Sequence, residues 1–225
     1  MLKKHIILVI ALTISLISVG ISQYKDSRFP TAITSKNSNT SMESMKIFEA
    51  SVSFPYPNWF THGFVGDIYK KQNGASFIFE EIPLEQTFDN WKELYAVYGL
   101  NSKSDKINLE KFIIYSIIPF QNVCGKNIKL AAVNKNSATP TYLLFCGKKS
   151  KSKYGEVAIL KFFKVKNTYI KVYQEWNITP FEVSNLGSNS SHWIDKIDIN
   201  KKSFNNAYNK IYNKASAIEA VNIKK

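Results

Sequence analysis

The sequence predicts an α/β fold in which an antiparallel β-sheet of about six to seven strands is sandwiched between helices, an α/β/α arrangement. The first observation behind this prediction is that apolar runs such as residues 141–146 lack clean alternation, as strands covered on both faces do. The second is the segment 201–221, where apolar residues recur at spacings of three and four. A helix with this pattern can cover one face of the sheet.

The N-terminus is typical of a secretory signal peptide, predicted over residues 1–22. Lys3 and Lys4 precede a largely apolar run over 6–19, and small residues follow it. The alternative is an uncleaved anchor, but the run is shorter than the roughly 20 residues that cross a bilayer. No Cys follows the run to accept a lipid. We therefore expect export and no transmembrane segment in the mature chain.

A disordered polar tether and one folded domain are expected after the signal peptide. Residues 23–45 are mostly Ser, Thr, Asn, Lys and Pro without a hydrophobic period, which predicts the tether. The chain of 225 residues is 44% hydrophobic and 14% aromatic, enough for one sizeable core over 46–225. A strand is predicted at 50–54. A hairpin follows around Asn73-Gly74, because both residues accept positive φ.

Residues 76–99 predict a strand, a turn and a helix in succession. The apolar run ends at Pro83, which has no N–H to donate to a sheet. Thr87 can cap a helix, and Trp91 and Leu94 stand three residues apart, so we expect an amphipathic helix that buries both. A longer helix is predicted over 109–124, bent by Pro119 and ended by Gly125.

The C-terminal half is richer in strands, predicted at 128–133, 142–146, 156–165 and 169–176. The last of these divides its side chains cleanly between two faces. One face carries Ile170, Val172 and Trp176, and the other carries Tyr169, Lys171, Tyr173 and Glu175. A short helix around 192–197 and the long helix over 201–221 complete the prediction.

The order of these segments resembles a known family. It comprises an FPYP-type first strand, a hairpin, an EEIP-like strand end, TFDNWKEL, a helix ending in Cys and a final hairpin closing in YQEW, over roughly 50–176. The set resembles the PsbP-like fold shared with the yeast Mog protein. It is most similar to exported bacterial proteins of that fold, including a type II secretion substrate of an intracellular Gram-negative pathogen. The resemblance implies a binding or scaffolding module and supplies no catalytic residues.

The two cysteines, Cys124 and Cys146, lie in apolar segments, and an oxidising compartment would let them pair. Such a disulfide closes a loop whose chain entropy is worth about 3 kcal/mol. Two buried free thiols are the alternative. A catalytic thiol is disfavoured because no His is near either residue in the sequence.

The net charge is +13, and Arg28 is the single arginine among 30 Lys and Arg residues. Bidentate recognition of phosphates and bases favours Arg, so this composition argues against sequence-specific nucleic-acid binding. The sharpest cluster of cations lies between two predicted strands and consists of Lys148, Lys149, Lys151 and Lys153. It is either a patch for an anionic ligand or a solvated loop tip that prevents aggregation.

The main cluster of acids consists of Glu80, Glu81, Glu85 and Asp89. Paired carboxylates can perform acid–base catalysis or hold Ca²⁺, although Asp89 near a helix N-terminus has a structural reason to be there. His62 and His192 are isolated, so neither a metal site nor a cofactor is predicted. No nucleophile elbow or phosphate-binding glycine loop is present in the sequence.

These observations predict a secreted, non-enzymatic binding protein that passes through the periplasm to the outside of the cell. The resemblance implies a virulence-associated substrate of type II secretion. The expected partner is a protein or an anionic surface. Two alternatives stay open: an acid-dependent hydrolase built on Glu80, Glu81 and Asp89, and an accessory factor retained in the envelope.

Overall fold

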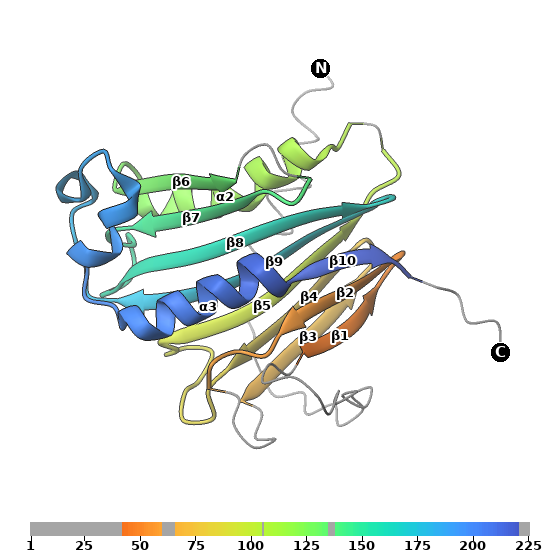
Figure 1. The fold of residues 1–225 in the computed structure, drawn as a ribbon, viewed down its shortest axis with the longest axis horizontal. Coiled ribbons are helices and arrows are strands. Elements are labelled where there is room, and N and C mark those ends of the chain that lie inside the picture. Colours follow the sequence, from red (N-terminus) through yellow and green to blue (C-terminus); the bar gives the residue numbers. More distant parts are fainter. Residues whose placement is uncertain (1–41, 60–65, 105, 135–137, 221–225) are drawn as a thin grey trace. The chain divides into compact units, whose positions relative to one another are not determined.

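The computed structural model describes residues 42–59, 66–104, 106–134 and 138–220 (Figure 1). The predicted signal peptide at 1–22, most of the predicted tether and His62 lie outside these residues. Strand β1 (Met42–Ile47) includes residues 42–45, which belong to the predicted tether. The folded part therefore begins before residue 46.

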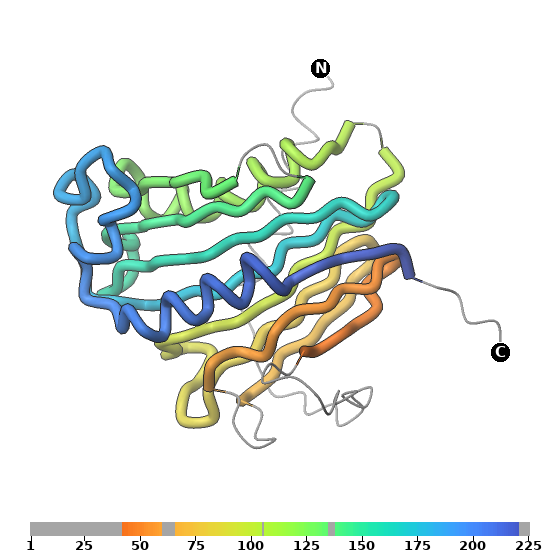
Figure 2. Tube along the Cα trace, viewed as in Figure 1, coloured from red at the N-terminus to blue at the C-terminus, as the bar shows by residue number. Residues whose placement is uncertain are grey.

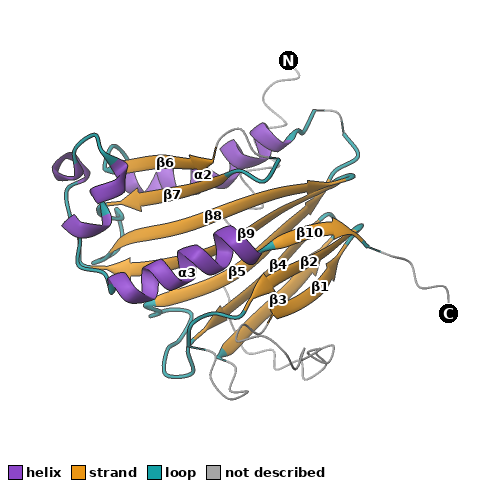
Figure 3. Cartoon of the chain, in the orientation of Figure 1, coloured by secondary structure: helices purple, strands orange, loops and turns teal. Residues whose placement is uncertain are grey.

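The main sheet has seven strands, all antiparallel, in the order β3-β4-β5-β9-β8-β7-β6 (Figure 3). This agrees with the six to seven strands predicted. The strands are β3 (Asp67–Asn73), β4 (Ser76–Ile82), β5 (Glu93–Asn101), β6 (Ile128–Asn134), β7 (Thr141–Cys146), β8 (Gly155–Val165) and β9 (Thr168–Ile178). The predicted hairpin joins β3 to β4, and Gly74 has a φ of 54° in its turn.

A second, three-stranded antiparallel sheet was not predicted. It has the order β1-β2-β10, in which β2 (Ala50–Pro55) lies between β1 and β10 (Ser216–Glu219). The first and the last described strands therefore pair with the same central strand.

Helix α2 (Leu109–Cys124) confirms the predicted helix. Asn108 caps its N-terminus by accepting a hydrogen bond from the Lys111 N–H at 2.8 Å, and Gly125 follows its end with a φ of 57°. The helix continues past Pro119. None of the helices in the described part of the chain combines the length and apolar composition needed to cross a bilayer.

Helix α3 (Lys201–Lys214) ends earlier than the predicted boundary at 221. Asn200 caps its start, but Ala215 has extended backbone with a ψ of 130°, and the chain continues as β10. The predicted short helix around 192–197 is a pair of 3-10 turns, η3 (Ser190–His192) and η4 (Ile194–Lys196), which follow η2 (Val183–Leu186).

Two hydrophobic cores lie on opposite faces of the main sheet. Alternate residues of β8 and β9 point to each core: Ile159 and Val172 join α3 and the three-stranded sheet, whereas Leu160 and Tyr173 join α2. The ribbon and the tube show α3 and β10 running across one face, with α2 on the other side (Figures 1 and 2). The predicted sandwich between helices is thus confirmed in outline. On one face of the main sheet, the three-stranded sheet forms the covering layer together with α3.

The predicted helix at 87–99 is wrong, because residues 93–101 form the central strand β5. Thr87 lies in a turn, where its carbonyl accepts a hydrogen bond from the Asn90 N–H at 2.9 Å. Strand β5 is apolar on both faces, since Leu94 contacts one core and Val97 the other. A three-residue spacing of bulky side chains did not distinguish this doubly covered strand from a helix.

Candidate functional site

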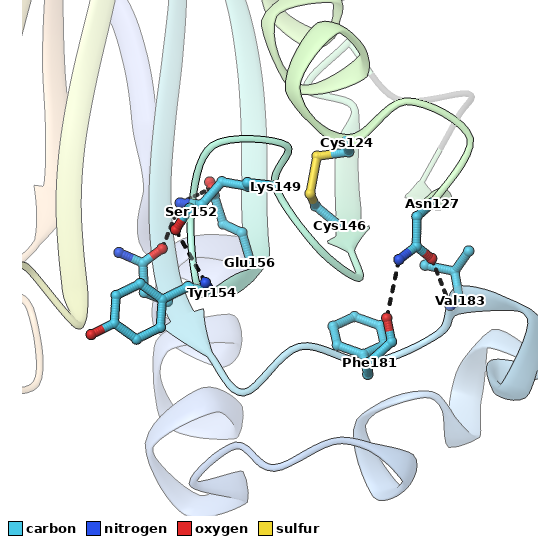
Figure 4. Close-up of a disulfide and its surroundings, with 10 residues drawn as sticks. Cys124, Asn127, Cys146, Lys149, Ser152, Tyr154, Glu156, Phe181 and Val183 are labelled. Carbon is cyan, nitrogen blue, oxygen red and sulfur yellow. Dashed lines mark hydrogen bonds and ion pairs between the residues drawn. A yellow bond between two sulfur atoms is a disulfide. The ribbon is translucent and has the colours of Figure 1, made fainter.

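A disulfide joins the end of α2 to the end of β7, as the cysteine content suggested (Figure 4). The Cys124 and Cys146 sulfur atoms are bonded, and their Cα atoms are 5.6 Å apart. Asn127, just beyond α2, accepts from the Val183 N–H and donates to the Phe181 carbonyl at 2.9 and 3.2 Å. The end of α2 is therefore fixed both to β7 and to the segment after β9.

The lysine loop, residues 147–154, follows this disulfide directly. Its backbone is held at three points: the Gly147 N–H donates to Asn127, the Ser150 N–H to Val123, and the Lys149 N–H to Tyr154, at 2.9, 2.7 and 3.1 Å. The loop therefore has one defined conformation, anchored to α2 and closed across its own base.

The four predicted patch lysines divide into two groups. Lys148, Lys151 and Lys153 are exposed, and they point three charges toward solvent. Lys149 instead turns inward, where its Nζ lies 2.9 Å from a Glu156 carboxylate oxygen (Figure 4). The same nitrogen lies 2.6 Å from Asn177 Oδ1 and 5.2 Å from the Trp91 ring centroid. Lys149 thus anchors the loop and leaves a patch of three cations.

The predicted acidic cluster does not come together. Glu80 and Glu81 are neighbours on β4, so their side chains point to opposite faces of the sheet. Glu85 and Asp89 are exposed in the segment between β4 and β5. The carboxylates that the hydrolase alternative requires are therefore not convergent.

Glu80, which is half-buried, belongs with four buried residues to a group that we call the ionic cluster, on the α2 side of the sheet. Its members are Glu80, Glu156, Lys171, Tyr173 and Glu175. Burial raises the pKa of Glu80 to about 7, against the opposing effect of Lys171. Burial and the Glu156 carboxylate raise the pKa of Glu175 well above its ordinary value, and burial lowers the pKa of Lys171.

Glu81 belongs to a different group, the inter-sheet cluster, on the α3 side. Glu81, Tyr95 and Gln174 lie side by side on β4, β5 and β9, and each has a buried polar atom without a hydrogen-bond partner among the described residues. Glu43 on β1 is close enough for its charge to act on Glu81. Burial and, after it, the Glu43 charge raise the pKa of Glu81 to about 7. Burial likewise raises the pKa of Glu43 to about 7.

In the described part of the chain, no group of three or more His, Cys, Asp or Glu side chains has an arrangement that could hold a metal ion. His192 is exposed beside Asp195, with Nδ1 at 3.7 Å from a carboxylate oxygen. Its position is that of a surface residue.

The sequence did not indicate that Glu43 and Glu156 belong to charged groups inside the fold. It did place Lys171 and Glu175 on one face of a strand, which is the signal that could have identified the ionic cluster. Charged residues on a strand face that a helix covers need polar or charged partners, because burying an unpaired charge is costly.

No protein-family model matches the sequence, and no curated protein matches it. Among solved structures, this structure is similar to that of the Saccharomyces cerevisiae Ran-binding protein Mog1p, with a TM-score of 0.43 and 10% sequence identity. The similarity covers 79% of this chain and 95% of that chain.

Proposed function

We propose that this chain is an exported, non-enzymatic binding protein that uses its lysine loop to contact an anionic surface. The observation that supports this most is that one lysine of the loop is held by polar contacts while three are exposed. Lys149 is used to fix the loop to Glu156 and Asn177, whereas Lys148, Lys151 and Lys153 remain exposed. A fixed loop loses little conformational entropy when it binds, so its charges are available at low cost.

The chemistry of the three cations favours a diffuse anionic surface over a single phosphate group. Lysine presents a point charge on a flexible stem and lacks the planar fork with which Arg binds one phosphate in two places. Each lysine close to an anionic membrane surface contributes about 1 kcal/mol. Three lysines together therefore favour binding by roughly 3 kcal/mol, or on the order of a hundredfold.

Charge reversal of the loop tests the proposal. The K148E/K151E/K153E variant is expected to bind vesicles containing phosphatidylglycerol at least a hundredfold more weakly than the unchanged protein, by the ~1 kcal/mol each cation supplies. Co-sedimentation at low and high salt measures this, since screening should weaken the binding of the unchanged protein too.

A matched control keeps the same change of net charge but places it elsewhere. Lys71, Lys103 and Lys202 are exposed and lie on β3, after β5 and on α3. The K71E/K103E/K202E variant should retain most of the vesicle binding. Equal losses in both variants would show that overall charge, and not the loop, drives association; no binding by the unchanged protein would remove the membrane as the partner.

Export is part of the proposal, and it accounts for the disulfide, because an oxidising periplasm permits Cys124 and Cys146 to pair before the folded chain leaves the cell. Immunoblots of culture supernatants from a parent strain and from one lacking type II secretion test it. Protein in the parent supernatant alone supports a secreted substrate. Protein retained with the cells in both strains supports the envelope accessory factor instead.

A further inference from the structure

The outer side of helix α2 carries apolar side chains where a surface helix ordinarily carries polar ones. Ile114 and Tyr115 are 48% and 42% exposed, and Ile118, one turn beyond Ile114, is half-buried. Leu130 on the edge strand β6 is 41% exposed. It pairs with Leu144 of the α2-side core, so it points to the same side of the sheet as α2. We call Ile114, Tyr115, Ile118 and Leu130 the apolar face.

Helix α3, on the other face of the sheet, shows that the apolar face does not follow from the overall composition. Both helices bury one side against the same sheet. The exposed positions of α3 are lysines or asparagines throughout, at 201–202, 205–206, 209 and 213–214. Apolar area gathered on one exposed surface is typical of a site that contacts another molecule or a membrane.

Lysines border the apolar face at both ends of α2. Lys106 and Lys111 are exposed at its start, where the Lys111 Nζ donates to the Lys106 carbonyl at 2.8 Å. The lysine loop is hydrogen-bonded to the other end of the helix. This loop lies on the α2 side of the sheet, because Lys149 contacts the ring of Trp91, which packs against the α2-side core. Glu110 is the single acidic side chain of α2.

Apolar side chains bordered by lysines fit an anionic lipid bilayer better than they fit a protein. At a membrane interface, buried apolar area and the attraction of lysines to anionic headgroups act together. Tyrosine, as at Tyr115, is enriched at the depth of the headgroups. A second copy placed on this face by a two-fold axis would bring the lysines of both chains together, and like charges oppose such pairing. The four side chains are also far fewer than the roughly 20–30 residues that each partner contributes to a standard protein interface.

We propose that the apolar face inserts into the headgroup region of an anionic phospholipid bilayer, beside the lysine loop. This inference rests on the proposed contact of the lysine loop with an anionic surface, and it identifies that surface as lipid. The apolar face supplies a hydrophobic part of the binding, which salt does not screen as it screens charges. The buried side of α2 remains in its core, so insertion requires no change of fold.

The same substitution at two exposed isoleucines tests the proposal in the otherwise unaltered protein. Ile114→Asn changes the apolar face, and Ile218→Asn makes the same change on β10, in the layer on the opposite face of the sheet, where Ile218 is 65% exposed. Binding is measured by co-sedimentation with phosphatidylglycerol vesicles and with dextran sulfate beads, which carry negative charge but have no apolar interior.

We expect Ile114→Asn to bind the vesicles about fivefold or more weakly, because about half of an isoleucine side chain no longer leaves water on binding. Its binding to the beads should not change, and Ile218→Asn should bind both as the unaltered protein does. The K148E/K151E/K153E variant should lose binding to vesicles and beads alike, since its charges act on any anionic surface. Circular dichroism verifies that each variant is folded.

Failure of the insertion and failure of the lysine-loop contact give different results. Vesicle binding that is unchanged in Ile114→Asn, or that falls equally in both isoleucine variants, overturns the insertion and leaves the loop contact in place. Binding of the unaltered protein to beads but not to vesicles does the same and points to an anionic partner other than lipid. Binding to neither overturns both proposals. Self-association in analytical ultracentrifugation that Ile114→Asn abolishes would assign the apolar face to a second copy of the chain.

Discussion

Lys161 shows how one buried cation can be stabilised without a carboxylate. Its Nζ donates to the Tyr212 and Ala215 carbonyl groups at 2.6 and 2.9 Å, at the C-terminal end of α3. These carbonyl groups have no partner within the helix, and the helix dipole places partial negative charge on them. Burial lowers the pKa of Lys161, and the two hydrogen bonds to carbonyl groups favour the charged amine and so act against that effect.

Replacing Lys161 with Met should therefore destabilise the fold. The variant leaves two carbonyl groups unpaired, and hydrogen bonds to a charged group contribute about 1.5–3 kcal/mol each. We expect the free energy of unfolding to fall by roughly 2–4 kcal/mol, measured by urea denaturation. Lys164→Met, on an exposed side chain of the same strand, is the control and should change stability little. Equal stability of both variants would contradict the capping role.

Single residues were the hardest features to predict. The sequence put Glu80 and Glu81 in one acidic cluster because they are adjacent, but adjacency in a strand sends side chains to opposite faces. It also grouped four lysines, whereas Lys149 turns inward to Glu156 and Asn177. Both errors concern side-chain direction, which depends on partners that lie far away in the sequence.

At the scale of elements, the disulfide joins helix α2 to the main sheet directly before the lysine loop. It fixes the end of α2 to β7, and the Ser150 N–H donates to the Val123 carbonyl of that same helix end. The lysine loop is consequently restrained both by the disulfide before it and by the hydrogen bond from Ser150 to Val123. Loss of the disulfide should affect global stability and loop order together.

The Cys124→Ser/Cys146→Ser variant tests this coupling. We expect it to lose about 3 kcal/mol of unfolding free energy, the chain-entropy value for a loop of this size. Hydrogen exchange at Ser150 should speed up as the helix end is released. A mass measurement without reductant establishes beforehand that the unaltered protein has lost the two thiol hydrogen atoms. Unchanged stability would show that hydrophobic packing alone fixes α2 to β7.

Elements with strong local signals were predicted well, and those set by distant partners were not. The hairpin at Gly74 and helix α2, with its Asn108 cap, follow from local chemistry. Strand β5 is defined by pairing with β4 and β9, and Gly99 on it leaves room for Ile47 of β1, whose Cγ2 would lie 2.5 Å from an added Cβ. Such pairing and packing cannot be read from spacing along one segment.

At the scale of the whole molecule, positive and negative charges are separated by depth. The chain has a net charge of +13, and most lysines among the described residues are exposed, whereas several carboxyl groups are buried or half-buried and form no salt bridge. They are Glu43, Glu80, Glu81, Glu93 and Glu175, and none forms an ion pair among the described residues. Burial raises the pKa of each, to about 7 for Glu43, Glu80 and Glu81.

This arrangement predicts a protein that is more stable in mild acid than at neutral or higher pH. Each of these carboxyl groups binds its proton more tightly in the folded chain than in the unfolded chain, where its pKa is near 4.5. Its contribution is fully present below that value and is lost as the pH rises through about 7. We expect the free energy of unfolding to fall by on the order of 2 kcal/mol or more between about pH 5 and about pH 8.

Urea denaturation at a series of pH values measures this slope, and Glu81→Gln isolates one contributor. Glu81 is 1% exposed at the contact of β1 with the main sheet, so its ionisation places a second negative charge beside Glu43. The amide cannot ionise, so the Glu81→Gln variant should lose less stability than the unaltered protein between about pH 5 and about pH 8. Glu85→Gln, which changes an exposed carboxyl group, is the control and should leave the dependence of unfolding free energy on pH unchanged. A stability that stays level or rises with pH over this range would mean that the buried carboxyl groups have cationic or solvent partners when folded, and the separation of charges by depth would not hold.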